Sequence, residues 1–161
     1  MRYNYKHALE MLTSWAKDEG YTDITFGYKG ISYINWKDYK KVGKMNTPKE
    51  IKLEGGNSDE ITTYIFLHEL GHHQLRKDWE KFNIILPTVA HAEVKYCKEK
   101  VKKYRRRISY MVSSMEEEFK AWEEGYKLGV KLGIKIDDKK WHQYKSKCLM
   151  GYIRFFGGAN K

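Results

Sequence analysis

The sequence predicts an α+β fold, with one helix and a small three-stranded sheet followed by a mainly helical second half. Segments rich in β-branched and aromatic residues cluster between residues 24 and 54, and helical periodicity dominates on both sides of them. The 161 residues are 41% hydrophobic, which suits one compact domain with a real core. We therefore expect residues 1–161 to form a single α+β domain.

The N-terminal part, residues 1–57, should hold the first helix and the sheet. Apolar residues recur at helical spacing between Asn4 and Glu19, and Gly20 is a suitable stop. Residues 24–28 and 31–36 are strand-like, and the short Lys29-Gly30 connection between them predicts a β-hairpin. Residues 50–54 alternate between apolar and charged side chains, which indicates a third, half-exposed strand.

The remaining residues should be helical. After Gly55-Gly56, Asn57 or Ser58 can cap a helix over residues 58–76, with acidic residues in its first turn, where the helix dipole favours them. A loop containing Pro87 should lead into a long helical region from Val89 to Leu132, interrupted near Arg107. A final helix is expected at 137–155, so residues 89–161 make up the helical part.

The helix at 58–76 carries the pattern His68-Glu69-Leu70-Gly71-His72. His68 and His72 are one turn apart, so both imidazoles can bind one metal ion. Glu69 is offset by about 100°, so it can contact a metal-bound water without being a ligand. Zinc uses such nitrogen donors and lowers the pKa of its bound water, and an adjacent carboxylate can take the proton. Two ordinary core histidines, bonded to backbone groups, are the alternative interpretation.

A catalytic site needs a third protein ligand, and Glu118 is the favoured candidate. Apolar residues between Ile108 and Trp122 recur at helical spacing, and Glu118 borders that stripe. A carboxylate that faces the core is costly unless it is paired or binds a metal. Glu116 lies at the opposite border and is the next candidate, while Glu117 should point away. These glutamates could instead form a solvated face that pairs with lysines.

One further alternative ligand is Asp78, six residues beyond His72. In the extended pattern that uses this position, a glycine three residues after the second histidine lets the chain turn back. Here that position holds Leu75, which disfavours Asp78.

The pattern at 68–72, followed by Glu118-Phe119-Lys120-Ala121, resembles the ImmA/IrrE-type zinc metallopeptidases of bacteria and mobile elements. The resemblance is close in these two motifs and loose over residues 1–135. It implies a zincin-like, gluzincin-type fold, with His68, His72 and Glu118 as Zn²⁺ ligands and Glu69 as general base. It also implies cleavage of an intracellular regulatory protein, often one linked to phages. Trp122 stands where the family commonly has Asn, and the spacer between the motifs is longer.

Several other polar residues are weaker candidates. His73 should lie on the surface, because it points about 100° away from His72. Five residues could stabilise a transition state, although residues of these types more often have no catalytic role. They are His7, His91, His142, Tyr110 and Tyr126.

Charge suggests a further partner. With 31 basic and 21 acidic residues, the net charge is +10, which favours acidic partners, although lysine-rich composition can also reflect an AT-rich genome. The basic run at 95–107 predicts a helix that could lie on nucleic acid, or a solvated face over an apolar seam. No apolar run is long enough to span a membrane, and residues 1–7 do not resemble a signal peptide, so none is expected. The two cysteines are expected to be reduced, and a cytoplasmic protein without a membrane partner is predicted.

Two functions follow as hypotheses. The first is a zinc metallopeptidase in which Glu69 activates water and the edge strand of the sheet aligns a protein or peptide substrate. The second is a metal-containing but non-catalytic protein that sequesters an acidic protein or nucleic acid. Glu69 discriminates between them, because a purely structural metal site has no use for that carboxylate.

Overall fold

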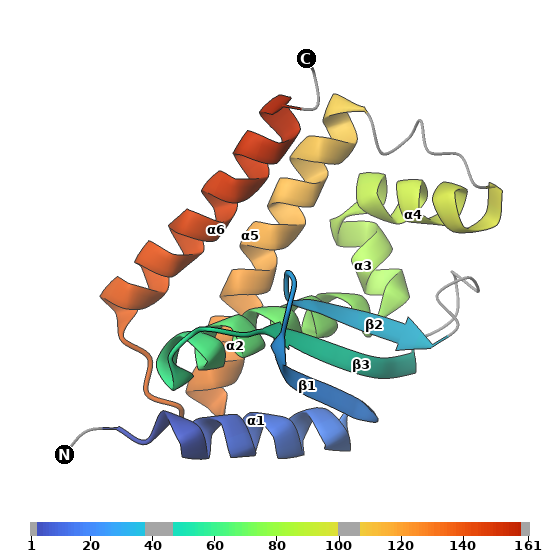
Figure 1. The fold of residues 1–161 in the computed structure, drawn as a ribbon. Helices are drawn as coiled ribbons and strands as arrows, with labels where there is room; N and C mark the ends of the chain where they lie inside the picture. Colours follow the sequence, from blue (N-terminus) through green and yellow to red (C-terminus); the bar gives the residue numbers. More distant parts are fainter. Residues whose placement is uncertain (1–2, 38–46, 100–106, 159–161) are drawn as a thin grey trace.

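The computed structural model describes residues 3–37, 47–99 and 107–158 (Figure 1). It has a mixed α+β architecture, mostly helical with one small sheet, so the broad fold class predicted from the sequence is confirmed. The elements in chain order are α1 (Tyr5–Asp18), β1 (Asp23–Tyr28), β2 (Tyr33–Lys37), β3 (Thr47–Glu54), α2 (Asp59–Arg76), α3 (Trp79–Ile85), α4 (Pro87–Glu99), α5 (Ile108–Lys131) and α6 (Asp138–Gly158).

The starts of α1 and α2 follow from their capping residues. The Asn4 side chain accepts a hydrogen bond from the His7 backbone N–H at 3.3 Å, and the Ser58 hydroxyl accepts one from Ile61 at 3.4 Å. Asp59 and Glu60 occupy the first turn of α2, as expected from the helix dipole. Because of these local signals, α1 and α2 each begin within one residue of the predicted position.

The sheet has the order β1-β3-β2, so the predicted hairpin of residues 24–28 with 31–36 is wrong. β1 pairs with β3 in parallel and β2 pairs with β3 antiparallel, with Ile24 and Ile34 both opposite Ile51. The chain does reverse between β1 and β2, but β3 lies between them. Ile51 and Leu53 are fully buried, which suits the central position. β2 is consequently an edge strand of the described sheet.

α2 runs through the middle of the molecule, with the sheet on one side and α1 and α5 also against it (Figure 1). All nine residues from Thr63 to Gly71 are buried. Because α2 has neighbours on several faces, a residue turned away from the metal motif is still in the core. His73, predicted at the surface, is only 1% exposed: it bonds to Glu19 at 2.7 Å and Tyr21 at 3.1 Å and stacks on Trp36.

The segment after α2 is more helical than predicted. The expected loop contains the short helix α3, and Pro87 is the first residue of α4, where its missing N–H is not needed. The interruption near Arg107 is confirmed in that α5 begins at Ile108. The basic run at 95–107 lies largely outside the described residues, so its nucleic-acid role remains a prediction. Within the described ranges, no helix has the length and apolar character needed to cross a membrane.

α5 packs on a different face from the one predicted. Ile108, Val112 and Phe119 of the predicted apolar stripe are 72%, 62% and 45% exposed. The buried face is built mainly from small or polar residues: Ser113, Glu117, Ala121, Trp122, Gly125, Leu128 and Gly129. A Cβ atom on Gly125 would collide with the carbonyl of Leu67, so α5 lies against the backbone of α2. Small residues are therefore what this helix contact requires.

Candidate metal centre

His68 and His72 of α2 meet Glu118 of α5, and one potential ligand atom from each lies within 4.8 Å of the other two. The three side chains are 10%, 12% and 13% exposed. The histidines come from consecutive turns of one helix, while Glu118 arrives from 46 residues further along the chain. The structure thus brings together the three residues predicted as metal ligands, and this group could hold a metal ion.

Two of the three separations between potential ligand atoms suit a small tetrahedral ion. Oε2 of Glu118 lies 3.2 Å from Nε2 of His68 and 3.4 Å from Nε2 of His72. Donors at ~2.0–2.1 Å from a tetrahedral zinc ion are separated by roughly 3.4 Å. The same Oε2 is buried, and its close neighbours include the two imidazole nitrogens. Two nitrogen donors and a carboxylate oxygen that converge in this way fit a bound cation.

Glu117 orients one of these histidines. Its Oε1 lies 3.1 Å from Nδ1 of His72, and its carboxylate also accepts hydrogen bonds from Arg76 Nε at 2.6 Å and Nη2 at 2.8 Å. Glu117 was predicted to point away from the core, but it is 4% exposed because Arg76 neutralises it there. A carboxylate behind a histidine ligand fixes the ring and its tautomer. His72 is therefore held with Nε2 turned towards Glu118.

His68, the other histidine of the cluster, is held by an aromatic ring. Trp122 stacks on His68 with ring centroids 4.4 Å apart and an angle of 19° between the planes. Trp122 is itself fully buried and packs edge-to-face on Trp141 of α6. The ImmA/IrrE-type family commonly has Asn at the position of Trp122. In this protein the flat indole ring supports the imidazole of His68 instead.

The electrostatics of the centre favour positive charge. Burial lowers the pKa of His68. Burial also acts to lower the pKa of His72, but the carboxylates of Glu118 and Glu117 outweigh it and raise that pKa well above its ordinary value. Burial works against ionised Glu118, yet the two histidines hold its pKa far below the usual range. Two ionised carboxylates beside paired imidazoles make this a site for a cation.

Glu69 lies beside the cluster and is 7% exposed. Burial raises its pKa to about 7; the His72 charge opposes this shift, and the charges of Glu118 and Glu54 add to it. A carboxyl with a pKa near neutrality can both accept and return a proton. Glu69 is outside the group that could hold a metal, and its role as general base stays a prediction.

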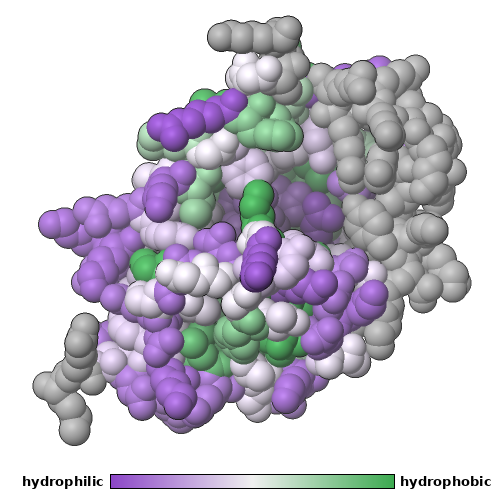
Figure 2. Space-filling view, in the orientation of Figure 1, coloured by the Kyte–Doolittle hydropathy of each residue, from purple (hydrophilic) through white to green (hydrophobic). Residues whose placement is uncertain are grey.

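A cleft of about 680 Å³ opens over the centre. Residues 32–36, which include most of the edge strand β2, form one wall, and the opposite walls come from α2, α5 and the end of α6. The space-filling view shows this face hollowed above the sheet, with hydrophilic and hydrophobic surface inside the hollow (Figure 2). The metal residues and Glu69 are thus open to a ligand that lies along β2.

Tyr152 of α6 is a site residue that the sequence analysis missed. It lines the cleft, and its hydroxyl interacts with the carboxylate of Glu118. Burial raises the pKa of Tyr152 most, and the charge of Glu118 and a hydrogen bond to its carboxylate raise it further. The hydroxyl therefore keeps its proton. The available signal was the recurrence of Tyr144, Cys148 and Tyr152 every four residues, which marks one face of the final helix.

The other residues named from the sequence have different positions. Tyr110 lines the cleft, whereas Tyr126 donates to Asp138 at 2.7 Å. His7, His91 and His142 are exposed and are not among the residues that line the cleft. Of the alternative ligands, Asp78 caps α3 through the Lys81 N–H at 3.1 Å, and Glu116 is 51% exposed and faces Lys120. Neither belongs to the cluster.

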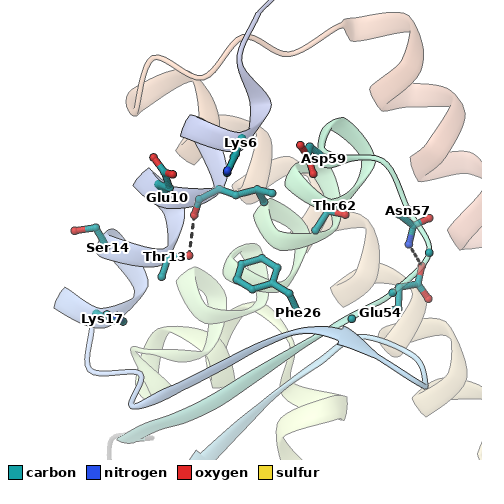
Figure 3. A pocket seen from close by; sticks show the side chains of 14 residues that line it. Lys6, Glu10, Thr13, Ser14, Lys17, Phe26, Glu54, Asn57, Asp59 and Thr62 are labelled. Carbon is teal, nitrogen blue, oxygen red and sulfur yellow. Dashed lines mark hydrogen bonds between the residues drawn. The ribbon is translucent and has the colours of Figure 1, made fainter.

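A larger hollow of about 900 Å³ lies elsewhere, between α1, Phe26 and the turn that leads into α2. Figure 3 shows Lys6 and Glu10 on α1, with Asp59 and Thr62 of α2 on the other side of the hollow. Its charges are mixed, and none of the three potential metal ligands lines it. Size alone therefore does not identify the functional site.

Comparisons of the chain with family models, with curated proteins and with solved structures found no match. The resemblance to ImmA/IrrE-type peptidases accordingly remains a prediction carried by the two motifs.

Proposed function

We propose that the protein is a zinc-dependent metallopeptidase that hydrolyses a peptide bond in an intracellular regulatory protein, of the kind encoded by phages or mobile elements. The observation that carries this proposal is the position of Glu69, buried beside the His68, His72 and Glu118 cluster at the base of an open cleft. A structural metal site would not need a carboxylate of this kind next to it.

His68, His72 and Glu118 would hold the ion, and two nitrogen donors with one oxygen donor are typical of catalytic zinc sites. Bound zinc would supply Lewis acidity at a substrate carbonyl. With three protein ligands, the set leaves a coordination position for water or substrate, which distinguishes it from closed structural sites.

The chain's own residues would carry the proton transfers and the alignment. Glu69 takes a proton from the attacking water and returns it to the leaving amine nitrogen. The Tyr152 hydroxyl, beside Glu118, donates a hydrogen bond to the substrate carbonyl oxygen as negative charge develops there. The edge strand β2 pairs with an extended peptide through main-chain hydrogen bonds. An edge strand above a two-histidine helix also supports the finer proposal of a zincin-like, gluzincin-type fold.

The test compares wild type with Glu69→Gln and Glu118→Ala. Each protein is reloaded with zinc, its metal content is measured by inductively coupled plasma mass spectrometry, and it is then incubated with a proteome-derived peptide library. Wild type should hold about one zinc per chain and cleave. Glu69→Gln should keep the zinc and lose at least about a hundredfold in rate. Glu118→Ala should lose the zinc. Normal cleavage by Glu69→Gln would show that the mechanism is wrong.

A second candidate, a metal-containing protein that sequesters an acidic partner, is favoured by the net charge of +10. It predicts that Glu69→Gln retains the full cellular effect, because binding does not require the carboxylate. A peptidase would lose that effect.

A further inference from the structure

A second cavity of about 450 Å³ adjoins the metal centre, and most of its wall is apolar. It meets the cleft at five residues that line both spaces, which are Ser32, His68, Glu69, Tyr152 and Phe155. A peptide lying in the cleft beside Glu69 would therefore have one side chain at the mouth of this cavity.

The wall is assembled from distant parts of the chain. Ile31 comes from the connection before β2, Ile65 from α2, Trp122 from α5, and Cys148 and Phe155 from α6. Trp122 is fixed by its contacts with His68 and Trp141, so that part of the wall is rigid. α6 closes the cavity, which gives this helix a role at the site.

The wall also has polar residues, which are Ser32, Glu54, His68, Glu69, Tyr144 and Tyr152, and the Glu54 carboxylate among them already has partners. Oε1 of Glu54 accepts hydrogen bonds from the Tyr144 hydroxyl and from Nδ2 of Asn57, both at 3.2 Å. These two donors share one carboxylate oxygen, so the preference for a neutral guest rests on the apolar surface that makes up most of the wall.

The rim is also apolar, although it faces water. Ile31 is 82% exposed and Phe155 is 71% exposed. Large apolar side chains at the mouth of an apolar cavity are typical of a binding site for an apolar group. A guest side chain entering there would remove water from both.

We propose that this cavity is a specificity pocket that binds a large apolar side chain, such as Leu, Met or Phe, of the residue adjoining the bond to be cut. The placement of that bond rests on the proposed peptidase function. The preference for an apolar side chain rests on the cavity alone.

Gly151 offers a way to fill the pocket without disturbing the fold. It lines the cavity on α6, and a Cβ atom added to it would meet no atom within 4 Å. Gly151→Leu should therefore place its side chain in the pocket while α6 remains helical. Gly157→Leu is the matched control, because Gly157 is in the same helix, has equally open surroundings and does not line the cavity.

The first measurement needs no metal and no cleavage. In a Cys97→Ser background, the Cys148 thiol is reacted with 4,4′-dithiodipyridine in metal-free protein, with N-acetyl-leucinamide, N-acetyl-phenylalaninamide or N-acetyl-lysinamide present. The two apolar amides should slow the reaction severalfold in the parent and in Gly157→Leu. In Gly151→Leu the thiol should react slowly throughout, with no further effect of the amides. Equal protection by the lysine amide, or none by any amide, would overturn the proposal.

The second measurement maps cleavage sites in the peptide library with zinc-loaded protein. Leu, Met or Phe should adjoin the cut, Gly151→Leu should shift the preference to small side chains, and Gly157→Leu should leave it unchanged. Cleavage without an apolar preference would overturn the pocket. No cleavage, combined with selective protection of Cys148, would count against the peptidase proposal while supporting the pocket.

Discussion

Gly71 of α2 packs against the backbone of Ala121 of α5 so closely that a Cβ atom at position 71 would overlap the Ala121 carbonyl group. Gly71 directly precedes His72, and Ala121 follows Glu118 by three residues. These two small residues therefore set the separation of the helices that carry the potential metal ligands. This contact is a physical reason for a glycine in the first motif.

Gly71→Ala should consequently weaken both the fold and the metal site. The added methyl group must push α5 away from α2, and overpacking of this kind costs about 1–3 kcal/mol. We expect a lower free energy of unfolding by urea denaturation and weaker zinc binding in competition with a chelator. Gly151→Ala is the control, since its surroundings are open. Unchanged zinc affinity in Gly71→Ala would show that the helix separation does not govern the site.

Glu117→Gln should weaken zinc binding without removing a ligand. The amide pairs less well with Arg76 and no longer holds His72 with a charged oxygen, and losses of about 10- to 100-fold in metal affinity are typical for such partners. Chelator competition measures the affinity, and urea denaturation of the metal-free protein separates it from stability. Glu116→Gln removes the same charge from a neighbouring, exposed position and should have little effect. Equal losses of zinc affinity in both variants would show that the loss of one negative charge, and not the bond between Glu117 and His72, causes the effect.

Tyr152→Phe should slow cleavage while the zinc remains bound. Loss of a hydrogen-bond donor to a developing oxyanion typically costs about 10²–10³ in kcat. The control is Tyr126→Phe, because the Tyr126 hydroxyl bonds to Asp138 and Tyr126 does not line the cleft. Steady-state kinetics and zinc content are measured together. If Tyr152→Phe loses zinc along with activity, the hydroxyl serves only to position Glu118.

Several predictions from short-range signals agree with the structure. Caps, the spacing of His68 and His72, and the order of helices and strands depend on residues close together in the sequence, and the structure agrees with them. The strand order could not be read in this way, because it depends on which strand pairs with both of the others, and β3 lies more than ten residues after β2 begins. Residues 24–28 and 31–36 are equally compatible with a hairpin and with the observed arrangement.

The environment of the site was harder to predict because it depends on contacts between distant residues. Glu118 was named from an apolar stripe that is partly exposed, yet the structure does bring it to the two histidines. Glu117 could be buried only because Arg76, 41 residues away, bonds to it. His73 is buried because α2 has neighbours on several faces, which hydrophobic periodicity along one helix does not reveal.

Away from the metal centre, Glu60 connects three helices. Because it is ionisable, we expect it to make the stability of the fold depend on pH. It accepts hydrogen bonds from Tyr5 at 3.0 Å, Tyr64 at 3.1 Å and Lys140 at 2.7 Å, which lie on α1, α2 and α6. Burial alone would raise the pKa of Glu60, but these bonds outweigh it and lower the pKa below its ordinary value. A carboxyl whose pKa is lower in the folded state stabilises the fold above its unfolded pKa of about 4.3. That contribution is lost as the pH falls through the folded pKa.

Glu60→Gln should therefore reduce the free energy of unfolding by a constant amount between pH 6 and 8. Below about pH 4.3 the difference from wild type should shrink, because protonation of Glu60 removes the same charge from the wild-type protein. Urea denaturation of both metal-free proteins between pH 3 and 8 measures this difference and keeps zinc release out of the comparison. A difference that stays constant down to pH 3 would show that the hydrogen bonds of Glu60, and not its charge, connect the three helices.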